Sequence, residues 1–250
     1  MQILKLLKEN KIKSELVKSS LPTITKLRLL SSKQQLLRVD NEEEFTKDDW
    51  SSVKRRFDKS ILLKGNNLLI ISDYGKGTLQ DIPAIIRKAK KLKKIVLVDP
   101  KGDNFSKYKG ADLITPNFPE FTGEVGPVKS EREITAKAKS LIKSLNLGAL
   151  LVTRGSDGMT LFNKEKGKVV RSDFPTQAKE VFDVSGAGDT VIASLAAALS
   201  AGFDMSSAVK LANVTAGIVV GKSGTSTASL SEIEPHFSGE EFISSLSEVK

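Results

Sequence analysis

The residues best suited to chemistry lie in one octet, Asp183-Val184-Ser185-Gly186-Ala187-Gly188-Asp189-Thr190. Two glycines around a small residue leave backbone N–H groups uncovered, and an apolar helix pattern follows from about Thr190. The N–H groups at the start of a helix, together with the helix dipole, favour an anion such as phosphate. Asp189 would repel that anion unless its carboxylate takes the proton of a hydroxyl that attacks a phosphoryl group held by the glycines. The octet therefore predicts phosphoryl transfer from a nucleotide to an alcohol.

The same octet also has a structural interpretation. Aspartate is common in helix caps, and glycines before helices are common in turns. The octet is not a P-loop, because no Gly-Lys-Ser/Thr follows the glycines, and it lacks the third glycine of the dinucleotide fingerprint. A second aspartate, Asp183, and the alanine-rich helix behind the glycines favour the functional interpretation.

Composition bounds the class of protein and the chemistry. The chain has 250 residues, 39% hydrophobic and 28% charged, which is typical of one large soluble α/β domain. Without cysteine, neither a disulfide framework nor a thiolate metal site is possible, and the single His236 excludes a multi-histidine site. No apolar run is long enough for a bilayer, and the N-terminus indicates an amphipathic helix rather than a signal peptide. We therefore expect a cytoplasmic protein without a membrane partner.

The net charge of +9 is concentrated in residues 1–110. A basic half can indicate nucleic-acid binding. Here many lysines fall on expected helix faces, as in the segment Arg87-Lys88-Ala89-Lys90-Lys91, and solvated helix faces explain them better. With 6% aromatic residues, the chain shows no basic–aromatic interleaving of the kind that stacks bases. We expect no nucleic-acid partner and rank nucleic-acid binding third among the hypotheses; it would require a steeply salt-dependent affinity.

Apolar runs alternate with helical patterns along most of the chain. Four runs indicate buried strands, at Leu68–Ser72, Ile95–Val98, Ala111–Thr115 and Ala149–Thr153. Helices are expected over residues 1–18, up to about Leu63, up to about Leu92 and over about Arg132–Leu145. Two short strands, Lys26–Leu30 and Gln35–Val39, predict a hairpin. The run that follows Arg154–Gly158, through Ser172, predicts short antiparallel strands. The alternation predicts a parallel sheet buried on both faces.

Polar residues and glycines follow the expected strands. In parallel sheets, ligands bind beyond the carboxyl ends of the strands. The residues at those ends, joined by the octet, are Asp73, Lys76, Asp99, Lys101, Asn117, Glu120, Thr153, Gly155 and Asp189. Their agreement in position is a stronger argument for a site than any single motif.

Four motifs together resemble the ribokinase-like (PfkB-type) carbohydrate kinase family. They are the octet 183–190, Asn117-Phe118-Pro119-Glu120, Thr153-Arg154-Gly155-Ser156-Asp157-Gly158 and Ala212-Asn213-Val214-Thr215-Ala216-Gly217. The resemblance covers nearly the whole chain. It implies an α/β fold with a mostly parallel, doubly wound sheet, helices on both faces and a small β lid hairpin at about residues 24–40. Residues 1–250 would form a single kinase domain that lacks its N-terminal portion.

Within that family, other segments are similar to the kinases that phosphorylate D-glycero-D-manno-heptose 7-phosphate at C1. That reaction feeds ADP-heptose synthesis for the lipopolysaccharide core. The segments are Pro22–Arg28, Gln34–Asp40, Ser72–Gly77, Asp99–Gly102 and Val219–Thr227. The resemblance therefore implies that the chain uses ATP to convert this phosphosugar to the 1,7-bisphosphate.

The resemblance also implies roles for the matching residues. Asp189 would be the general base, and the anion hole would be Gly186, Ala187 and Gly188. The nucleotide would be lined by Asn117, Thr153, Gly155, Asn213 and Gly217. Glu120 would reach Mg²⁺, in part through water, because a hard cation prefers oxygen ligands and often keeps its waters. A monovalent cation such as K⁺ would lie among Asp183, Ser185, Gly224 and Thr227.

The candidate substrate residues are Arg28, Arg38, Asp73, Lys76 and Lys101. Arg28, Arg38 and Lys101 would hold the phosphate that the sugar already carries, because the planar fork of arginine suits phosphate. Ordinary surface charge explains these three residues equally well. The spacing of Asn117 and Glu120 likewise fits a helix cap with its N3 acid. Both alternatives stay open at the level of sequence.

Two departures from the family pattern shape the expectations. The resemblance begins partway into the family fold, so that an N-terminal βα portion that grips the sugar has no counterpart here. A second hypothesis is therefore a catalytically impaired fragment, or a subunit of a split kinase, that binds nucleotide and needs the missing segment. With a single histidine, the chain cannot contain the His-x-Gly-His nucleotidyltransferase that some relatives carry. The apolar faces of the lid hairpin predict a homodimer formed through the lid.

Overall fold

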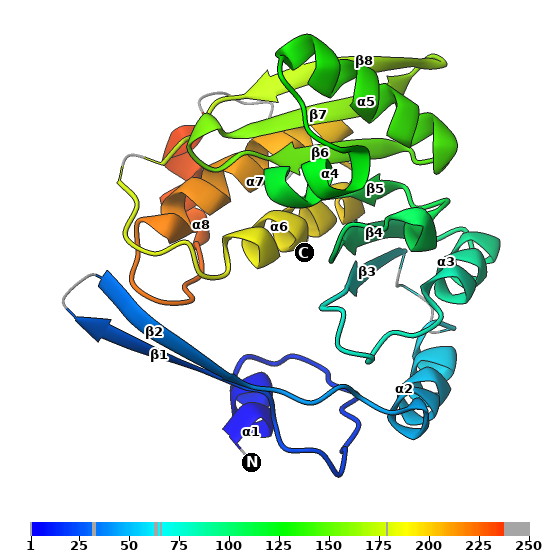
Figure 1. Ribbon diagram of the computed structural model, residues 1–250, viewed down its shortest axis with the longest axis vertical. Helices are drawn as coiled ribbons and strands as arrows, with labels where there is room; N and C mark the ends of the chain where they lie inside the picture. The colour runs from blue at the N-terminus through cyan, green and yellow to red at the C-terminus, as the bar shows by residue number, and fades with distance from the viewer. Residues whose placement is uncertain (1, 32–33, 63–64, 66, 179, 238–250) are drawn as a thin grey trace. The chain divides into compact units, whose positions relative to one another are not determined.

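The computed structural model describes residues 2–31, 34–62, 65, 67–178 and 180–237 (Figure 1). The chain divides into two compact units. The first comprises Met1–Lys64 and Gly75–Gln80, and the second comprises Gly65–Tyr74 and Asp81–Lys250. That residues 1–250 form a single kinase domain stays a prediction.

The first unit contains two helices and a hairpin. Helix α1 (Gln2–Glu9) is shorter than the helix predicted for residues 1–18. Strands β1 (Thr25–Ser31) and β2 (Gln34–Asn41) form the expected antiparallel hairpin. Helix α2 (Lys47–Ser60) begins at a capping box in which the Thr46 and Asp49 side chains each accept the other residue's backbone N–H. This reciprocal bonding satisfies two N–H groups that a helix start otherwise leaves unpaired.

The two faces of the hairpin differ in chemistry because side chains alternate along a strand. Leu27 and Leu29 lie opposite Val39 and Leu37, and all four are between 47% and 59% exposed. On the other face Arg28 lies directly opposite Arg38. The hairpin thus combines an uncovered apolar face with a basic one.

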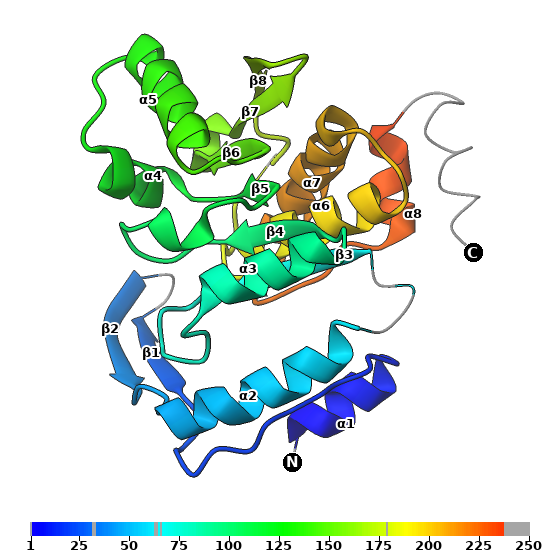
Figure 2. The same cartoon turned by 90° about the vertical axis from the view of Figure 1, so that its right-hand side faces the viewer.

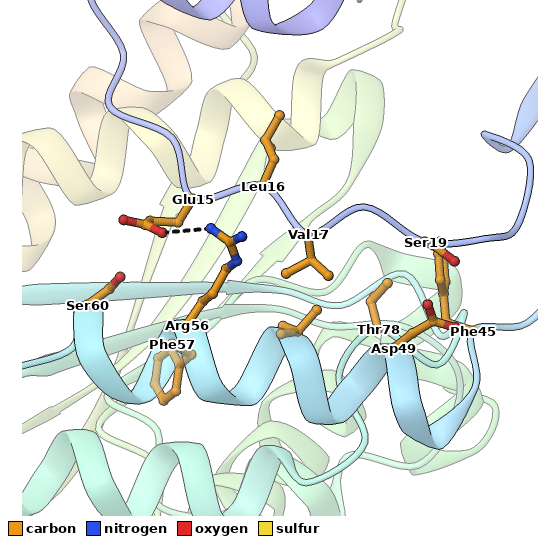
Figure 3. Close-up of a pocket in the computed structure, with 11 residues that line it drawn as sticks. Glu15, Leu16, Val17, Ser19, Phe45, Asp49, Arg56, Phe57, Ser60 and Thr78 are labelled. Carbon is orange, nitrogen blue, oxygen red and sulfur yellow. Dashed lines mark hydrogen bonds and ion pairs between the residues drawn. The ribbon is translucent and has the colours of Figure 1, made fainter.

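A pocket of about 410 Å³ lies within the first unit, between residues 15–19 and helix α2 (Figure 3). Val53 and Phe57 give it apolar walls, and Glu15 pairs with Arg56 at a distance of 3.2 Å. None of the site residues predicted from sequence lines this pocket.

The second unit is built on a six-stranded sheet in which the strands follow chain order. Its strands are β3 (Leu68–Ser72), β4 (Ile95–Asp99), β5 (Leu113–Ile114), β6 (Ala149–Thr153), β7 (Met159–Glu165) and β8 (Lys168–Phe174). Strands β3 to β6 pair in parallel, and β7 and β8 pair antiparallel. The mostly parallel sheet and its antiparallel extension confirm the sequence-based expectation. The third strand is shorter than the predicted Ala111–Thr115.

Helices cover both faces of this sheet, as expected. Helices α3 (Ile82–Lys91), α4 (Phe118–Val125) and α5 (Glu131–Ser144) contact strands from one side, while α6 (Ala187–Ser200) and α7 (Met205–Val220) contact them from the other (Figure 2). The short elements are η1 (Ser106–Tyr108), η2 (Gly155–Asp157), α8 (Leu230–Ile233) and η3 (Glu234–His236). Among the described residues, no helix combines the length and apolar character that a membrane crossing requires.

The core explains the continuous apolar runs in the sequence. Leu97, Leu113 and Leu151 belong to one buried cluster with residues of α6 and α7, whereas Val96 and Val98 alternate with Leu97 and are equally buried. A strand covered on both sides needs apolar residues at successive positions. This core fixes the carboxyl ends of β3 to β6, which carry the predicted site.

Candidate active site

The carboxyl ends of the parallel strands bring several predicted site residues to one edge of the sheet. Ser72 pairs in register with Asp99, and the backbone N–H of Asp73 bonds to the Asp99 carbonyl at 3.1 Å. Farther along the edge, Asn117 forms a parallel bridge with Thr153. The ends of four strands therefore present polar groups side by side, as the spacing in the sequence predicts.

The octet forms the entry to helix α6. Gly186 is the N-cap residue with φ of 81°, and no side chain caps the first turn in this part of the described chain. A Cβ at Gly186 would lie 3.0 Å from Thr225 Cγ2, so both the left-handed backbone and the close contact call for glycine. The helix begins at Ala187, three residues before the expected start, because Ala187, Gly188 and Asp189 themselves form the first turn.

Asp189 projects from this first turn with an exposed side chain. Its Oδ1 atom accepts a hydrogen bond from Tyr74 Oη at 3.3 Å. Burial, followed by the charge of Asp189, raises the pKa of Tyr74, so the phenol stays a donor at neutral pH. Tyr74 follows β3, and the contact therefore joins the start of α6 to the sheet edge.

Asp99 is the half-buried carboxyl group at the end of β4. Burial, with the negative charges of Asp189 and Glu120, raises its pKa to about 6, while Lys101 acts in the opposite direction. Desolvation and like charges both disfavour the ionised form of a carboxylic acid. Asp189, Glu120 and Lys101 thus lie close enough for their charges to influence the Asp99 carboxyl group.

Asp73, a predicted substrate residue, is buried and has partners within the protein. Its Oδ2 atom accepts hydrogen bonds from Lys107 Nζ and Tyr108 Oη, each at 2.7 Å. The Tyr108 hydroxyl in turn accepts the backbone N–H of Lys101 at 2.9 Å. Asp73 therefore anchors the loop after β4 to the end of β3, and contact with a substrate remains a prediction.

Asn117 and Glu120 form a complete capping box at the start of α4. Glu120 N–H donates to Asn117 Oδ1 at 2.8 Å, and Asn117 N–H donates to Glu120 Oε2 at 3.1 Å. The other carboxylate oxygen of Glu120 pairs with Lys101 Nζ at 3.0 Å. This is the structural alternative that the spacing allowed. The roles of both residues with nucleotide and Mg²⁺ stay predictions.

The remaining residues predicted to line the nucleotide lie in different environments. Thr153 is half-buried at the end of β6, and Gly155 begins η2 with φ of 60°. Asn213 is buried in α7 and donates through Nδ2 to the Pro175 carbonyl at 2.7 Å. A Cβ at Gly217 would lie 2.9 Å from the backbone carbon of Gln177, so this glycine permits a close approach of two segments.

The residues predicted to hold a monovalent cation join two loops. Asp183 accepts the backbone N–H groups of Ser185 at 2.8 Å and Gly224 at 3.1 Å. Lys222 Nζ donates to the Thr227 carbonyl at 2.8 Å. The two loops are thus in contact, but no cluster of three or more histidine, aspartate or glutamate side chains suited to a metal occurs among the described residues.

Three predicted substrate residues belong to the first unit. Arg28 and Arg38 lie opposite each other on the hairpin, and Arg38 Nε pairs with Asp40 at 2.9 Å. Lys76 pairs with Glu42. Two of the three, Arg38 and Lys76, thus already have acidic partners within the first unit.

Sequence reasoning did not assign roles to Tyr74, Lys107 and Tyr108. Tyr74 stands between Asp73 and Gly75 in a segment that carries part of the family resemblance, which was the available signal. Lys107 and Tyr108 come from the irregular segment around η1, where no hydrophobic period indicates which side chains point toward the sheet edge.

Comparison with known proteins agrees with this arrangement. Residues 1–233 match the model of the pfkB family carbohydrate kinases. The chain is 51% identical over 212 residues to bifunctional protein HldE of Aeromonas hydrophila, and 52% identical over 213 residues to that of Histophilus somni. In both cases the match covers 85% of this chain and 44% of the relative. The chain thus spans less than half the length of these curated relatives.

Solved structures show the same fold. Escherichia coli phosphofructokinase-2 in complex with potassium has a TM-score of 0.79 and 15% identity, covering 94% of this chain and 76% of that one. Ribokinase from Thermotoga maritima has a TM-score of 0.71 and 22% identity, with 94% and 75% covered. Both confirm the ribokinase-like α/β architecture. The chain therefore belongs to the pfkB family of carbohydrate kinases, which makes it a phosphotransferase with a sugar hydroxyl as acceptor.

Proposed function

We propose that this chain is a cytoplasmic kinase that transfers the γ-phosphoryl group of ATP to C1 of D-glycero-D-manno-heptose 7-phosphate. The product would be the 1,7-bisphosphate used for ADP-heptose and the lipopolysaccharide core. The observation that carries the proposal is the position of Asp189, in an uncapped first turn beside the ends of β3 and β4. About half of the residues are identical to those of HldE proteins over most of the chain, which supports the choice of sugar.

In the proposed reaction, Asp189 takes the proton of the C1 hydroxyl as its oxygen attacks the γ-phosphorus. A new oxygen–phosphorus bond forms, and the bond from the γ-phosphorus to the β–γ bridging oxygen breaks. ADP leaves with that electron pair. The N–H groups of Gly186, Ala187 and Gly188 would donate to the phosphoryl oxygens as negative charge builds on them.

The residues around the strand ends suit a nucleotide and its metal in their chemistry. Glu120 offers carboxylate oxygens, the type of ligand that Mg²⁺ prefers, and is one of the charges that disfavour ionisation of Asp99. When bound, Mg²⁺ would supply positive charge that offsets the phosphates. The proposed nucleotide contacts are Asn117, Thr153, Gly155, Asn213 and Gly217, and the proposed K⁺ ligands are Asp183, Ser185, Gly224 and Thr227.

The substrate's own phosphate is proposed to bind Arg28, Arg38 and Lys101, with Asp73 and Lys76 as further substrate residues. Two like charges placed directly opposite each other on a hairpin are destabilising unless an anion offsets them. Among the described residues of the hairpin, Asp40 forms a short pair with Arg38, through Nε at 2.9 Å. A phosphate would satisfy the planar donors of both.

The test is ATP consumption by the purified chain with Mg²⁺ and heptose 7-phosphate, with the product identified by phosphorus NMR. Asp189→Asn is expected to lower kcat by about 10²–10⁴ because the base is lost. Asp48→Asn, an exposed aspartate of α2, is the matched control and should keep the wild-type rate. A chain that binds ATP but consumes none with any phosphosugar would contradict the kinase proposal. Faster turnover of fructose 6-phosphate would contradict only the choice of sugar.

The apolar face of the hairpin further supports a homodimer that pairs the lids of two copies. Leu27, Leu29, Leu37 and Val39 are exposed together on one face. An apolar hairpin face of this kind is stabilised when a second layer covers it. Sedimentation equilibrium should therefore give a dimer for the wild type and a monomer for Leu37→Asp. A wild-type monomer at micromolar concentration would contradict the lid dimer.

A further inference from the structure

The catalytic carboxylate has a partner that the phosphoryl-transfer reaction does not itself require. Among the described residues, the hydrogen bond recorded for the Asp189 side chain comes from Tyr74 Oη, 3.3 Å from Oδ1. A carboxylate can only accept, so the phenol must donate. The contact joins residues 115 positions apart in sequence, and it is therefore a product of the fold rather than of local helix geometry.

Tyr74 reaches Asp189 from a firmly held backbone. The residue before it, Asp73, is buried and bonded to Lys107 Nζ and Tyr108 Oη, while its backbone N–H bonds to the Asp99 carbonyl. Neighbouring side chains of an extended segment point in opposite directions. Asp73 thus points into the protein, and Tyr74 is left exposed at the edge where Asp189 lies.

The negative charges around Asp189 explain why a hydrogen-bond donor to its carboxylate would matter. Negative charge gathers at this edge, since the charges of Asp189 and Glu120 both act on the Asp99 carboxyl group. Like charges push an exposed aspartate toward other rotamers, in which its oxygens point away from the acceptor site. One fixed donor on Oδ1 restricts this freedom and leaves Oδ2 for the hydroxyl of the sugar.

We propose that Tyr74 is a positioning residue for the catalytic base, holding the Asp189 carboxylate through Oδ1 so that Oδ2 faces the acceptor hydroxyl. The proposal rests on the proposed kinase function, in which Asp189 takes the sugar proton. Tyr74 transfers no proton itself and stays neutral throughout. Its contribution lies in geometry, on which phosphoryl transfer depends strongly.

The kinetic test is Tyr74→Phe, which removes one oxygen and keeps the ring. We expect kcat to fall about 10- to 100-fold, the size of effect that misplacement of a catalytic group produces, with the KM for ATP within about twofold of wild type. In an Asp189→Asn background, Tyr74→Phe should cause no further loss, because the two residues act as one unit. Tyr108→Phe is the matched control, since it removes the chain's other phenol hydroxyl and acts on Asp73 instead; its loss should add to that of Asp189→Asn.

A spectroscopic test needs no catalytic activity. The chain has two tyrosines. Burial strongly raises the pKa of Tyr108, whereas the Tyr74 side chain is exposed, so the first tyrosinate absorbance on raising the pH is expected from Tyr74. Asp189→Asn removes a negative charge that raises the pKa of Tyr74, and this absorbance should therefore appear at lower pH than in the wild type. Asp48→Asn should leave it in place.

The outcomes separate the two claims. An unchanged tyrosinate titration in Asp189→Asn would overturn the Tyr74 contact whether or not the chain is a kinase. An active wild type with an equally active Tyr74→Phe would overturn the positioning role alone. A faster Tyr74→Phe would also overturn it, because the phenol would then be occupying the place of the acceptor hydroxyl. An inactive wild type whose titration shifts as expected would count against the kinase proposal and in favour of the contact.

Discussion

Helices α4 and α6 start in the same way in sequence and differently in structure. Each has an acid three residues after its N-cap residue, Glu120 after Asn117 and Asp189 after Gly186. In α4 the two side chains close a capping box on each other. In α6 the N-cap residue has no side chain, and the acid is bonded by Tyr74 from the end of β3.

The difference shows how one local pattern can serve stability in one place and chemistry in another. In a capping box the carboxylate of the acid accepts a backbone N–H, which favours a structural role for Glu120. A start without a side-chain cap can leave N–H groups for an anion and its acid for another partner. In α6 the N–H of Ala187 donates to the Val184 carbonyl at 3.2 Å. The N-cap residue, asparagine or glycine, decides between the two outcomes.

The largest effect is expected from placing a side chain at the open helix start. Gly186→Ala forces an L-residue into a left-handed conformation, at a cost of about 1–2 kcal/mol, and brings a methyl group within 3.0 Å of Thr225 Cγ2. The first turn should shift, and we expect kcat to fall about 100-fold or more, measured by ADP release.

Gly188→Ala is the matched substitution in the same turn. A Cβ there meets nothing within 4 Å, and alanine is a better helix former, so the free energy of unfolding should rise by about 0.5–1 kcal/mol. If Gly186→Ala retained full activity, the open first turn would not be the phosphoryl site, and the contrast between α4 and α6 would lose its functional meaning.

The sequence predicted the parallel sheet, the hairpin and the edge at which the polar residues gather. These features follow from hydrophobic period and from residues placed directly after strands, and both are local signals. The octet likewise identified the start of α6, although the helix begins at Ala187 rather than near Thr190. The choice between a cap and a ligand site at Asn117 stayed open because both use the same spacing.

Hydrophobic period and local spacing could not predict contacts between residues that are distant in sequence. Tyr74 reaches Asp189, and Lys107 reaches Asp73, only because the ends of β3 and β4 and the start of α6 meet at one edge. The buried position of Asp73 was also missed, because aspartate after a strand is usually exposed. Hydrophobic period fixes which face of an element is buried, but it does not determine which partner a polar group will find.

An intermediate effect is expected from Glu120→Gln. Glutamine also closes a capping box, so the free energy of unfolding should stay within about 0.5 kcal/mol of wild type. Loss of the pair with Lys101 leaves a lysine side chain that is 55% exposed and can be solvated, although the Glu120 side chain is only 14% exposed. If Glu120 serves Mg²⁺ as proposed, the Mg²⁺ concentration at half-maximal rate should rise about tenfold.

Asn117→Ala makes the opposite change at the same helix start. It removes the cap and should lower the free energy of unfolding by about 1 kcal/mol, measured by urea denaturation. A Glu120→Gln variant with an unchanged Mg²⁺ requirement would assign this start to stability alone. The comparison between α4 and α6 would then be sharper, with one helix start purely structural and the other catalytic.

A smaller effect than that of Gly186→Ala is expected at Asp99, whose carboxyl group is influenced by the acids of both helix starts. Its pKa is raised to about 6, by burial first and then by Asp189 and Glu120, against about 3.9 in an unfolded chain. Below about pH 4 the group is protonated in both states and carries no electrostatic cost. As the pH rises through about 6, the folded state must accept the charge, and this contribution to stability is lost.

Asp99→Asn should therefore match the wild type in unfolding free energy at pH 4 and exceed it at pH 8. Because the side chain keeps part of its solvent, we expect a gain of about 1–2 kcal/mol rather than the full linkage value. Urea denaturation at a series of pH values measures it, with Asp48→Asn as the control for loss of one charge. Equal differences at pH 4 and pH 8 would mean that the pKa of Asp99 is not raised in the folded chain. In the Asp189→Asn background the gain from Asp99→Asn should shrink, because one of the two neighbouring charges is already gone.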